Sequence, residues 1–127
     1  NTEHNQLCIA QRTWMRTNSS LLLSEGTKVV AKAWQRFKEE TGWKNSTVNK
    51  MFTHQVSEPQ RKIGLKAIGV PLDIDHPTLH YVGNTASVAA PISMAIGLDN
   101  GVVDEGDKVV LFGVGSGINS IVLGIQW

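Results

Sequence analysis

The sequence predicts an α/β protein in which helices cover the faces of a layered, mixed sheet. Segments with helical periodicity alternate with short apolar runs, and the chain closes with two such runs around a glycine-rich turn. Alternation of this kind favours a sheet with helices on its faces. The chain has 127 residues, of which 41% are hydrophobic, so it is long enough to bury a core as one domain.

The first clear element is a long amphipathic helix. Its apolar residues recur at helical spacing, while lysine and glutamate residues occupy the opposite face. Ser19 or Ser20 is a suitable N-cap, Gly42 is a suitable stop, and an interruption is expected near Gly26. Residues 1–18 show no clear period and receive no assignment.

The middle of the chain is predicted to alternate between strands and helices. The expected elements are a strand over residues 50–54, a helix over 57–69, a second strand over 78–82 and a helix over 86–98. A right-handed crossover is expected to join the two strands. Both strands would then lie in one sheet.

The end of the chain is predicted to be a β-hairpin. Residues 108–114 and 118–127 are nearly continuous apolar runs, and Gly115-Ser116-Gly117 separates them. A phosphate-binding loop is not indicated, because no Gly-Lys-Ser/Thr follows and the next segment is a strand. The glycines are assigned to the hairpin turn. Because glycine has no side chain, a ligand can approach the backbone closely there, and the backbone N–H groups are able to hold an oxyanion.

Composition excludes several classes of function. The formal net charge is +1 and the charges are scattered, so neither a nucleic acid nor an anionic membrane is expected as a partner. The apolar run from Val109 to Ile125 is interrupted by polar residues and glycines, which makes a poor membrane span. Cys8 is the single cysteine, so no intrachain disulfide forms, and a structural role in a reducing cytosol is expected.

Metal and serine-hydrolase sites are not indicated either. His76 and His80 are four residues apart but flank Pro77, where helical ligand geometry is not available. No Gly-x-Ser-x-Gly elbow occurs in the chain. We therefore expect no metal and no cofactor.

Two residues are candidates for chemistry. His54 ends a predicted strand just before a helix, where ligands collect in open α/β folds. Asn84 follows Gly83 between a predicted strand and a predicted helix. Taken singly, each also has a structural interpretation, as a packed histidine and as an N-cap or turn asparagine.

These residues belong to a set of motifs that occur in a fixed order. The motifs are Phe52-Thr-His54-Gln55, then Gly83-Asn84-Thr85 thirty residues later, then Pro91, and finally the glycine-rich hairpin. Together they resemble the C-terminal half of ketoacyl-ACP synthase III, over about residues 34–127. Residues 2–42 and the ending Gly115-Ser-Gly-Ile-Asn are similar to the enzymes that condense two fatty acyl-CoAs head to head in olefin biosynthesis.

The resemblance implies a thiolase-like fold of two halves. Residues 1–127 would be the C-terminal half-domain, and the absent N-terminal half would hold the nucleophilic cysteine, so the fragment is expected to be inactive alone. By position, His54 and Asn84 match the family's catalytic histidine and asparagine, and the Ser116 main-chain N–H matches its oxyanion donor. The implied protein is a cytoplasmic, homodimeric acyltransferase of fatty acid metabolism that uses acyl-CoA or acyl carrier protein substrates.

Two departures from the synthase III pattern bear on the substrate. Pro59 stands where that family has an arginine linked to carrier-protein docking, and Val82 replaces a histidine before Gly83. Delivery by CoA or by carrier protein, and condensation with or without decarboxylation, both stay open at this point. The alternative function is a noncatalytic binding or assembly module that keeps the same half-fold.

Overall fold

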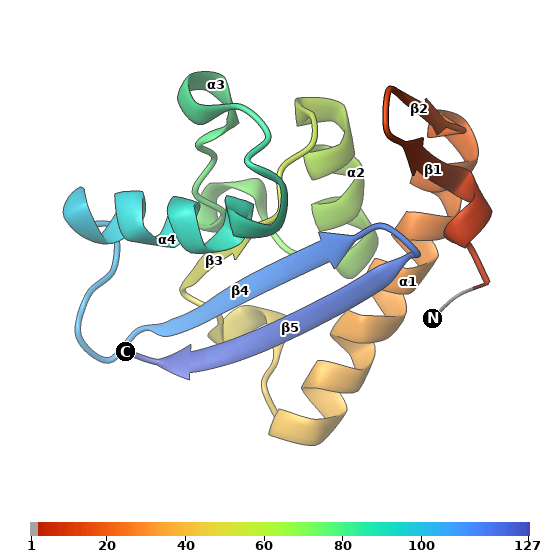
Figure 1. Cartoon of the computed structure of the whole chain (residues 1–127). Coiled ribbons are helices and arrows are strands. Elements are labelled where there is room, and N and C mark those ends of the chain that lie inside the picture. The colour runs from red at the N-terminus through yellow and green to blue at the C-terminus, as the bar shows by residue number, and fades with distance from the viewer. Residues whose placement is uncertain (1–2) are drawn as a thin grey trace.

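The computed structural model describes residues 3–127, and its centre is a mixed three-stranded sheet (Figure 1). The strands are β3 (Lys50–Thr53), β4 (Lys108–Gly115) and β5 (Asn119–Gln126), in the order β3-β4-β5. β3 runs parallel to β4, while β4 and β5 form the antiparallel hairpin. The predicted layered α/β architecture with a mixed sheet is confirmed.

One face of this sheet is covered by α1 (Ser19–Thr41) and α2 (Glu58–Ile68). Trp34 and Phe37 of α1 are buried and pack in one cluster with Met51, Val110 and Phe112 from the strands. Alternate strand residues point to opposite faces, so these three side chains all lie on the helix-covered side. The main hydrophobic core of the chain therefore lies on this face.

The other face carries α4 (Ala89–Asp99), which packs against β3 and β4. The helix approaches the sheet closely at Gly97, where an added Cβ would lie 2.5 Å from a ring carbon of Phe52. β5 lacks comparable cover on this side, and Ile121 and Leu123 are 58% and 49% exposed. The sheet is thus closed on one face and partly open on the other.

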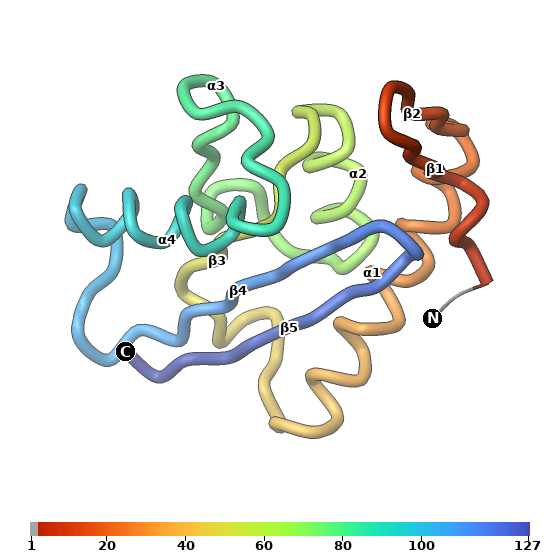
Figure 2. Tube along the Cα trace, in the orientation of Figure 1, coloured from red at the N-terminus to blue at the C-terminus, as the bar shows by residue number. Residues whose placement is uncertain are grey.

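A second, two-stranded sheet lies beside the start of α1 (Figure 2). It consists of β1 (Cys8–Gln11) and β2 (Trp14–Thr17), paired antiparallel, in the region that received no assignment from sequence. Within residues 3–127, no helix combines the length and the apolar character that crossing a membrane requires.

Most predicted helix boundaries are confirmed. Gly42 and Gly69 end α1 and α2 in the left-handed conformation, and Ser57 caps α2 through its hydroxyl. Two details of α1 were wrong: Asn18 rather than Ser19 or Ser20 is the N-cap, and the helix continues through Gly26. Packing of the apolar face against the sheet outweighs the weak helix propensity of one glycine.

The predicted strand over residues 78–82 is wrong, and its correction matters for the site. These residues form a one-turn helix, α3 (Leu79–Val82), and no strand follows α2 until β4. Asp75 of this connection forms an isolated parallel bridge with Met51, and the backbone N–H of His76 donates to the Met51 carbonyl at 3.0 Å. The right-handed crossover expected between strands at residues 50–54 and 78–82 is therefore wrong as well, because residues 78–82 are not a strand.

Candidate active site

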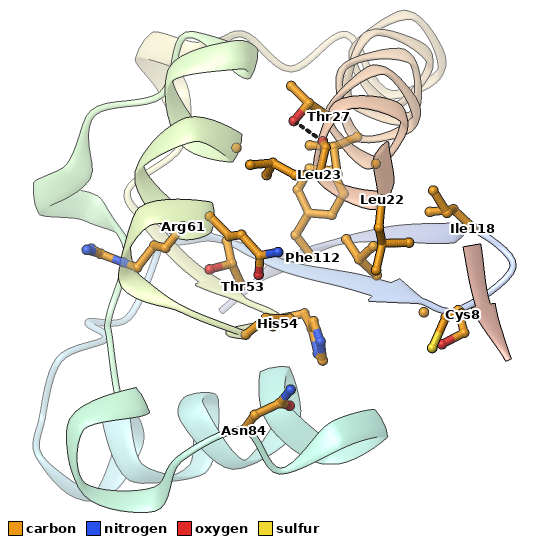
Figure 3. Close-up of a pocket in the computed structure, with 18 of the residues that line it drawn as sticks. Cys8, Leu22, Leu23, Thr27, Thr53, His54, Arg61, Asn84, Phe112 and Ile118 are labelled. Carbon is orange, nitrogen blue, oxygen red and sulfur yellow. Dashed lines mark hydrogen bonds between the residues drawn. The ribbon is translucent and has the colours of Figure 1, made fainter. Parts of the chain in front are cut away.

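The two candidate side chains and the hairpin turn all border one cavity of about 630 Å³ (Figure 3). His54 comes from the end of β3, Asn84 from the loop after α3, and Ser116 from the turn between β4 and β5. The remaining wall is mostly apolar and comes from α1, α2 and the β1-β2 hairpin, with Leu22 and Leu23 of α1 among its residues. His54 and Asn84, which are separate candidates in the sequence, thus line one cleft.

His54 is placed by the sheet itself. Its backbone N–H donates to the carbonyl of Phe112 on β4 at 2.7 Å, which continues the parallel ladder one residue beyond β3. Burial lowers the pKa of the His54 ring, and a hydrogen bond with the Ala86 backbone offsets part of this effect. The Ala86 backbone therefore favours the protonated ring, in opposition to burial.

Asn84 is fixed by the same residue, Ala86. The amide oxygen of Asn84 accepts from the backbone N–H of Ala86 at 2.9 Å, which leaves the amide NH2 group to serve a ligand. Ala86 has a φ of 54°, a left-handed conformation that a residue with a side chain seldom adopts. The backbone of Ala86 therefore holds both candidates at once, and backbone strain of this kind concentrates at functional sites.

Ser116 is exposed at the end of the hairpin, on the rim of the cavity. Its carbonyl accepts from the side-chain amide of Asn119 at 3.3 Å, and Ile118, just beyond it, is only 1% exposed. The buried Ile118 anchors the turn against the body of the domain. A backbone N–H in an anchored turn is suited to stabilising negative charge on a ligand oxygen.

A buried ion pair stands behind His54, and sequence reasoning did not identify it. The Arg61 guanidinium of α2 donates to the Asp75 carboxylate, whose side chain is 0% exposed, and Asp75 accepts from the backbone N–H of Thr53 at 3.2 Å. Burial raises the pKa of Asp75, and Arg61 works in the opposite direction. The pair fixes the residue directly before His54. The sequence does not single it out, because Asp73 and His76 stand in the same short stretch as Asp75.

His54 also borders a second, smaller cavity of about 150 Å³ on the α4 side of the sheet. Pro91 of α4 and Ile121 and Leu123 of β5 line this cavity. The second cavity therefore adjoins the uncovered part of the sheet. His54 is thus accessible from two directions, one through the large apolar cavity and one through the open face.

Neither Cys8 nor His76 is expected from the sequence to carry chemistry. Cys8 is half-buried, lies on the wall of the large cavity and has its sulfur 3.5 Å from the Thr17 hydroxyl. Among residues 3–127 no group of three or more His, Cys, Asp or Glu side chains has the arrangement of a metal site. His76 instead packs edge-on against Phe52.

Comparison with known proteins defines the class of this chain. Residues 39–127 match the family described as 3-oxoacyl-[acyl-carrier-protein] synthase III C terminal. Since this match spans more than half of the chain, the chain belongs to that family. The crystal structure of 3-oxoacyl-(acyl carrier protein) synthase III, FabH, from Xanthomonas oryzae covers 100% of the chain with a TM-score of 0.95 and 29% identity. The thiolase-like fold is therefore shown.

Two further relatives are an acyl-CoA:acyl-CoA alkyltransferase and a protein named OleA. The chain is 34% identical over 98% of its length to an acyl-CoA:acyl-CoA alkyltransferase of Shewanella oneidensis. The structure of OleA from Xanthomonas campestris covers 100% of the chain with a TM-score of 0.94 and 30% identity. The chain spans only 38% of the Shewanella protein and 37% of the OleA chain, so it corresponds to one part of these longer proteins.

Proposed function

We propose that the full-length protein is an acyltransferase that joins two acyl thioesters by a Claisen condensation. His54 and Asn84 would be its catalytic residues in this part of the chain, with the Ser116 main-chain N–H as an oxyanion donor. The observation that carries the proposal is the convergence of His54 and Asn84 on one cavity, with Ala86 bonded to both. A structural histidine and a turn asparagine have no reason to share an orienting residue beside an apolar cavity.

The protonation state of His54 suggests its first role. Burial lowers the pKa of His54 below its ordinary value, which favours the neutral ring near pH 7, and a neutral imidazole has one nitrogen that is able to accept a proton. We infer that it takes the proton of the cysteine thiol supplied by the N-terminal half. The thiolate then attacks the first acyl thioester and expels its carrier as a thiolate, which takes a proton from solvent, so the acyl group stays on the cysteine and His54 stays protonated.

The second role of His54 is shared with Asn84. Once protonated, His54 keeps its bond to Ala86 and offers the second N–H to the carbonyl of the second thioester, beside the Asn84 amide. The α-proton of that thioester passes to a base outside these residues, and both donors stabilise the enolate oxygen. The α-carbon then attacks the acyl-cysteine carbonyl, a C–C bond forms, and the C–S bond to the cysteine breaks. The Ser116 N–H would stabilise the oxyanion of this step.

The relatives and the local sequence favour acyl-CoA for both substrates. The Shewanella relative is named as an acyl-CoA:acyl-CoA alkyltransferase, and Pro59 cannot replace the arginine of the synthase III pattern. Condensation without decarboxylation follows if both substrates are simple acyl-CoAs. The apolar wall of the large cavity suits an acyl chain, and the proposed steps use no metal or other cofactor.

The open face of the sheet is our proposed contact with the missing N-terminal half. Ile121 and Leu123 of β5 and Val88 before α4 are exposed there, next to the cavity that reaches His54 from that side. A cysteine delivered through this face would meet the His54 ring. We also propose, from the family resemblance, that the complete protein is a cytoplasmic homodimer.

The test replaces the two side chains in the full-length protein. His54→Ala and Asn84→Ala are each expected to lower the rate of condensation by about a hundredfold or more, because each removes a transition-state donor, with little change in thermal stability. Labelled acyl-CoA is followed separately onto the cysteine and into the β-keto product. Loading of the cysteine should survive in Asn84→Ala, since this step forms no enolate.

The matched control is His80→Ala, which removes an exposed histidine of α3 that does not border the large cavity. It should condense acyl-CoA at the wild-type rate. If His54→Ala and Asn84→Ala also do so, the two residues are structural. The noncatalytic binding module would then be the better description of this half-fold.

A further inference from the structure

The residue after His54 makes three hydrogen bonds to a segment more than twenty residues away. Gln55 is 1% exposed, and its Oε1 accepts from the backbone N–H groups of Thr78 at 2.9 Å and Leu79 at 2.8 Å. Its Nε2 donates to the carbonyl of His76 at 3.2 Å. Both polar ends of this buried side chain are therefore used to hold one short stretch of backbone.

That stretch is the start of α3, and it lacks a cap of its own. Thr78 occupies the N-cap position, but its hydroxyl pairs with the Ser93 hydroxyl of α4 at 2.6 Å and makes no capping bond. The first N–H groups of a helix need acceptors from outside the helix. Gln55 supplies the acceptor, so a residue of the His54 segment caps a helix that is distant in sequence.

α3 leads directly to Asn84. The helix is a single turn, and the N–H of Gly83 closes it on the carbonyl of Leu79 at 3.0 Å. Asn84 is the next residue. Between the oxygen of Gln55 and the backbone of Asn84 there is therefore only one closed helical turn, with little freedom to lengthen or tilt.

We propose that Gln55 is a positioning residue that sets the placement of Asn84 relative to His54 by capping α3. The inference rests on the proposed function, because it assigns Gln55 a role in the same reaction. It adds a second connection between the two catalytic groups, independent of Ala86. Gln55 contacts neither reacting atom in this role, and the cavity wall does not include it.

The chain offers a closely matched control at Asn45. The Asn45 amide also makes three hydrogen bonds between separate elements, to Trp34, Ile68 and Gly69, and it does not border the large cavity. Gln55→Met and Asn45→Leu each replace a cross-linking amide by an apolar side chain of similar shape. Both should lower the melting temperature, since both leave backbone groups without partners.

Only Gln55→Met should change the chemistry. In the full-length protein, at a temperature well below both melting points, its kcat for condensation is expected to fall by about tenfold to a hundredfold with cysteine loading intact. Asn45→Leu should stay within about twofold of wild type, since none of its hydrogen-bond partners is His54, Asn84 or Ser116. Gln55→Glu keeps an acceptor for Thr78 and Leu79 and should recover most of the lost rate.

A readout without turnover tests placement directly. The His54 ring signal in NMR titrations should shift in Gln55→Met and not in Asn45→Leu, because displacement of the segment that contains Ala86 alters the His54 environment. Equal kcat values and equal His54 titrations in the two variants would overturn the inference. If Gln55→Met does not fold, Gln55→Asn replaces it, since one methylene less prevents the amide from reaching both N–H groups, and the same comparison applies.

The outcomes separate this inference from the proposed function. Full condensation in His54→Ala and Asn84→Ala overturns the proposed function, and the inference falls with it. Loss of condensation in those variants, together with an unaffected Gln55→Met, overturns the role of Gln55 alone.

Discussion

The two faces of the β3-β4-β5 sheet are built in different ways. Beneath α1, the ring of Trp34 stacks on Phe37 and Phe112 at centroid distances of 5.2 and 6.2 Å, in a cluster that includes residues of α2 and the strands. Beneath α4, the helix contributes small buried residues, among them Ser93 and Gly97. One face is filled by large apolar side chains, whereas the other depends on close approach of backbone and on polar contacts.

This difference separates the residues that stabilise the chain from those that support the proposed function. The α1 face carries the main hydrophobic core, in which Trp34, Phe37 and Phe112 are buried. The buried polar residues Gln55, Thr78 and Ser93 are linked on the α4 side, around the segments that carry His54 and Asn84. This second face also leaves Ile121 and Leu123 exposed. The site therefore draws on both sides of the sheet: its buried polar supports lie on the α4 side, whereas its large cavity is walled mainly by α1 and α2.

The largest expected effect breaks the α1 face. Trp34→Ala should lower the free energy of unfolding by about 3–5 kcal/mol, because it removes a buried ring and leaves a cavity between α1 and β4. Urea denaturation of the isolated chain measures the change. Trp14→Ala is the control, since Trp14 is 47% exposed on β2, and it should stay within about 0.5 kcal/mol of wild type. Equal losses would mean that Trp34 does not anchor a core.

A smaller effect tests close approach on the α4 face. Gly97→Ala places a Cβ 2.5 Å from the Phe52 ring, so α4 or the ring must move, and a loss of about 1–3 kcal/mol is expected. Gly64→Ala in α2 is the matched control, because nothing lies within 4 Å of the added Cβ. It should instead stabilise the chain by about 0.5–1 kcal/mol through helix propensity. Thermal unfolding measures the change in melting temperature of both variants. If the space between α4 and Phe52 accepted the added methyl group, the two changes would have the same sign.

The smallest effect on stability concerns the exposed part of the α4 face. Ile121→Ser combined with Leu123→Ser should change the unfolding free energy of the isolated chain by less than about 1 kcal/mol, because both side chains are already largely hydrated. Self-association, followed by light scattering, should nevertheless fall, since the apolar patch is reduced. If self-association were unchanged in the double variant, the surface responsible for it would not include Ile121 and Leu123.

Local sequence signals determined much of this fold. The glycines at positions 42 and 69 end α1 and α2, Ser57 begins α2, and the glycine-rich turn joins β4 to β5. Each of these features depends on a few neighbouring residues whose backbone preferences act locally. The resemblance of His54 and Asn84 to a catalytic pair was likewise visible in the sequence, because spacing and neighbours carried it.

Tertiary structure alone decided how those parts meet. Residues 78–82 have a strand-like pattern, yet Gln55 supplies a cap from another element and the segment folds as α3. The burial of Asp75 against Arg61 also depends on a contact between elements that are distant in sequence. Local propensities are worth fractions of a kcal/mol per residue, about 0.7 kcal/mol or less, whereas an unsatisfied buried polar group costs about 1–3 kcal/mol. At residues 78–82, where the local strand propensity conflicts with the buried polar contacts, the polar contacts prevail.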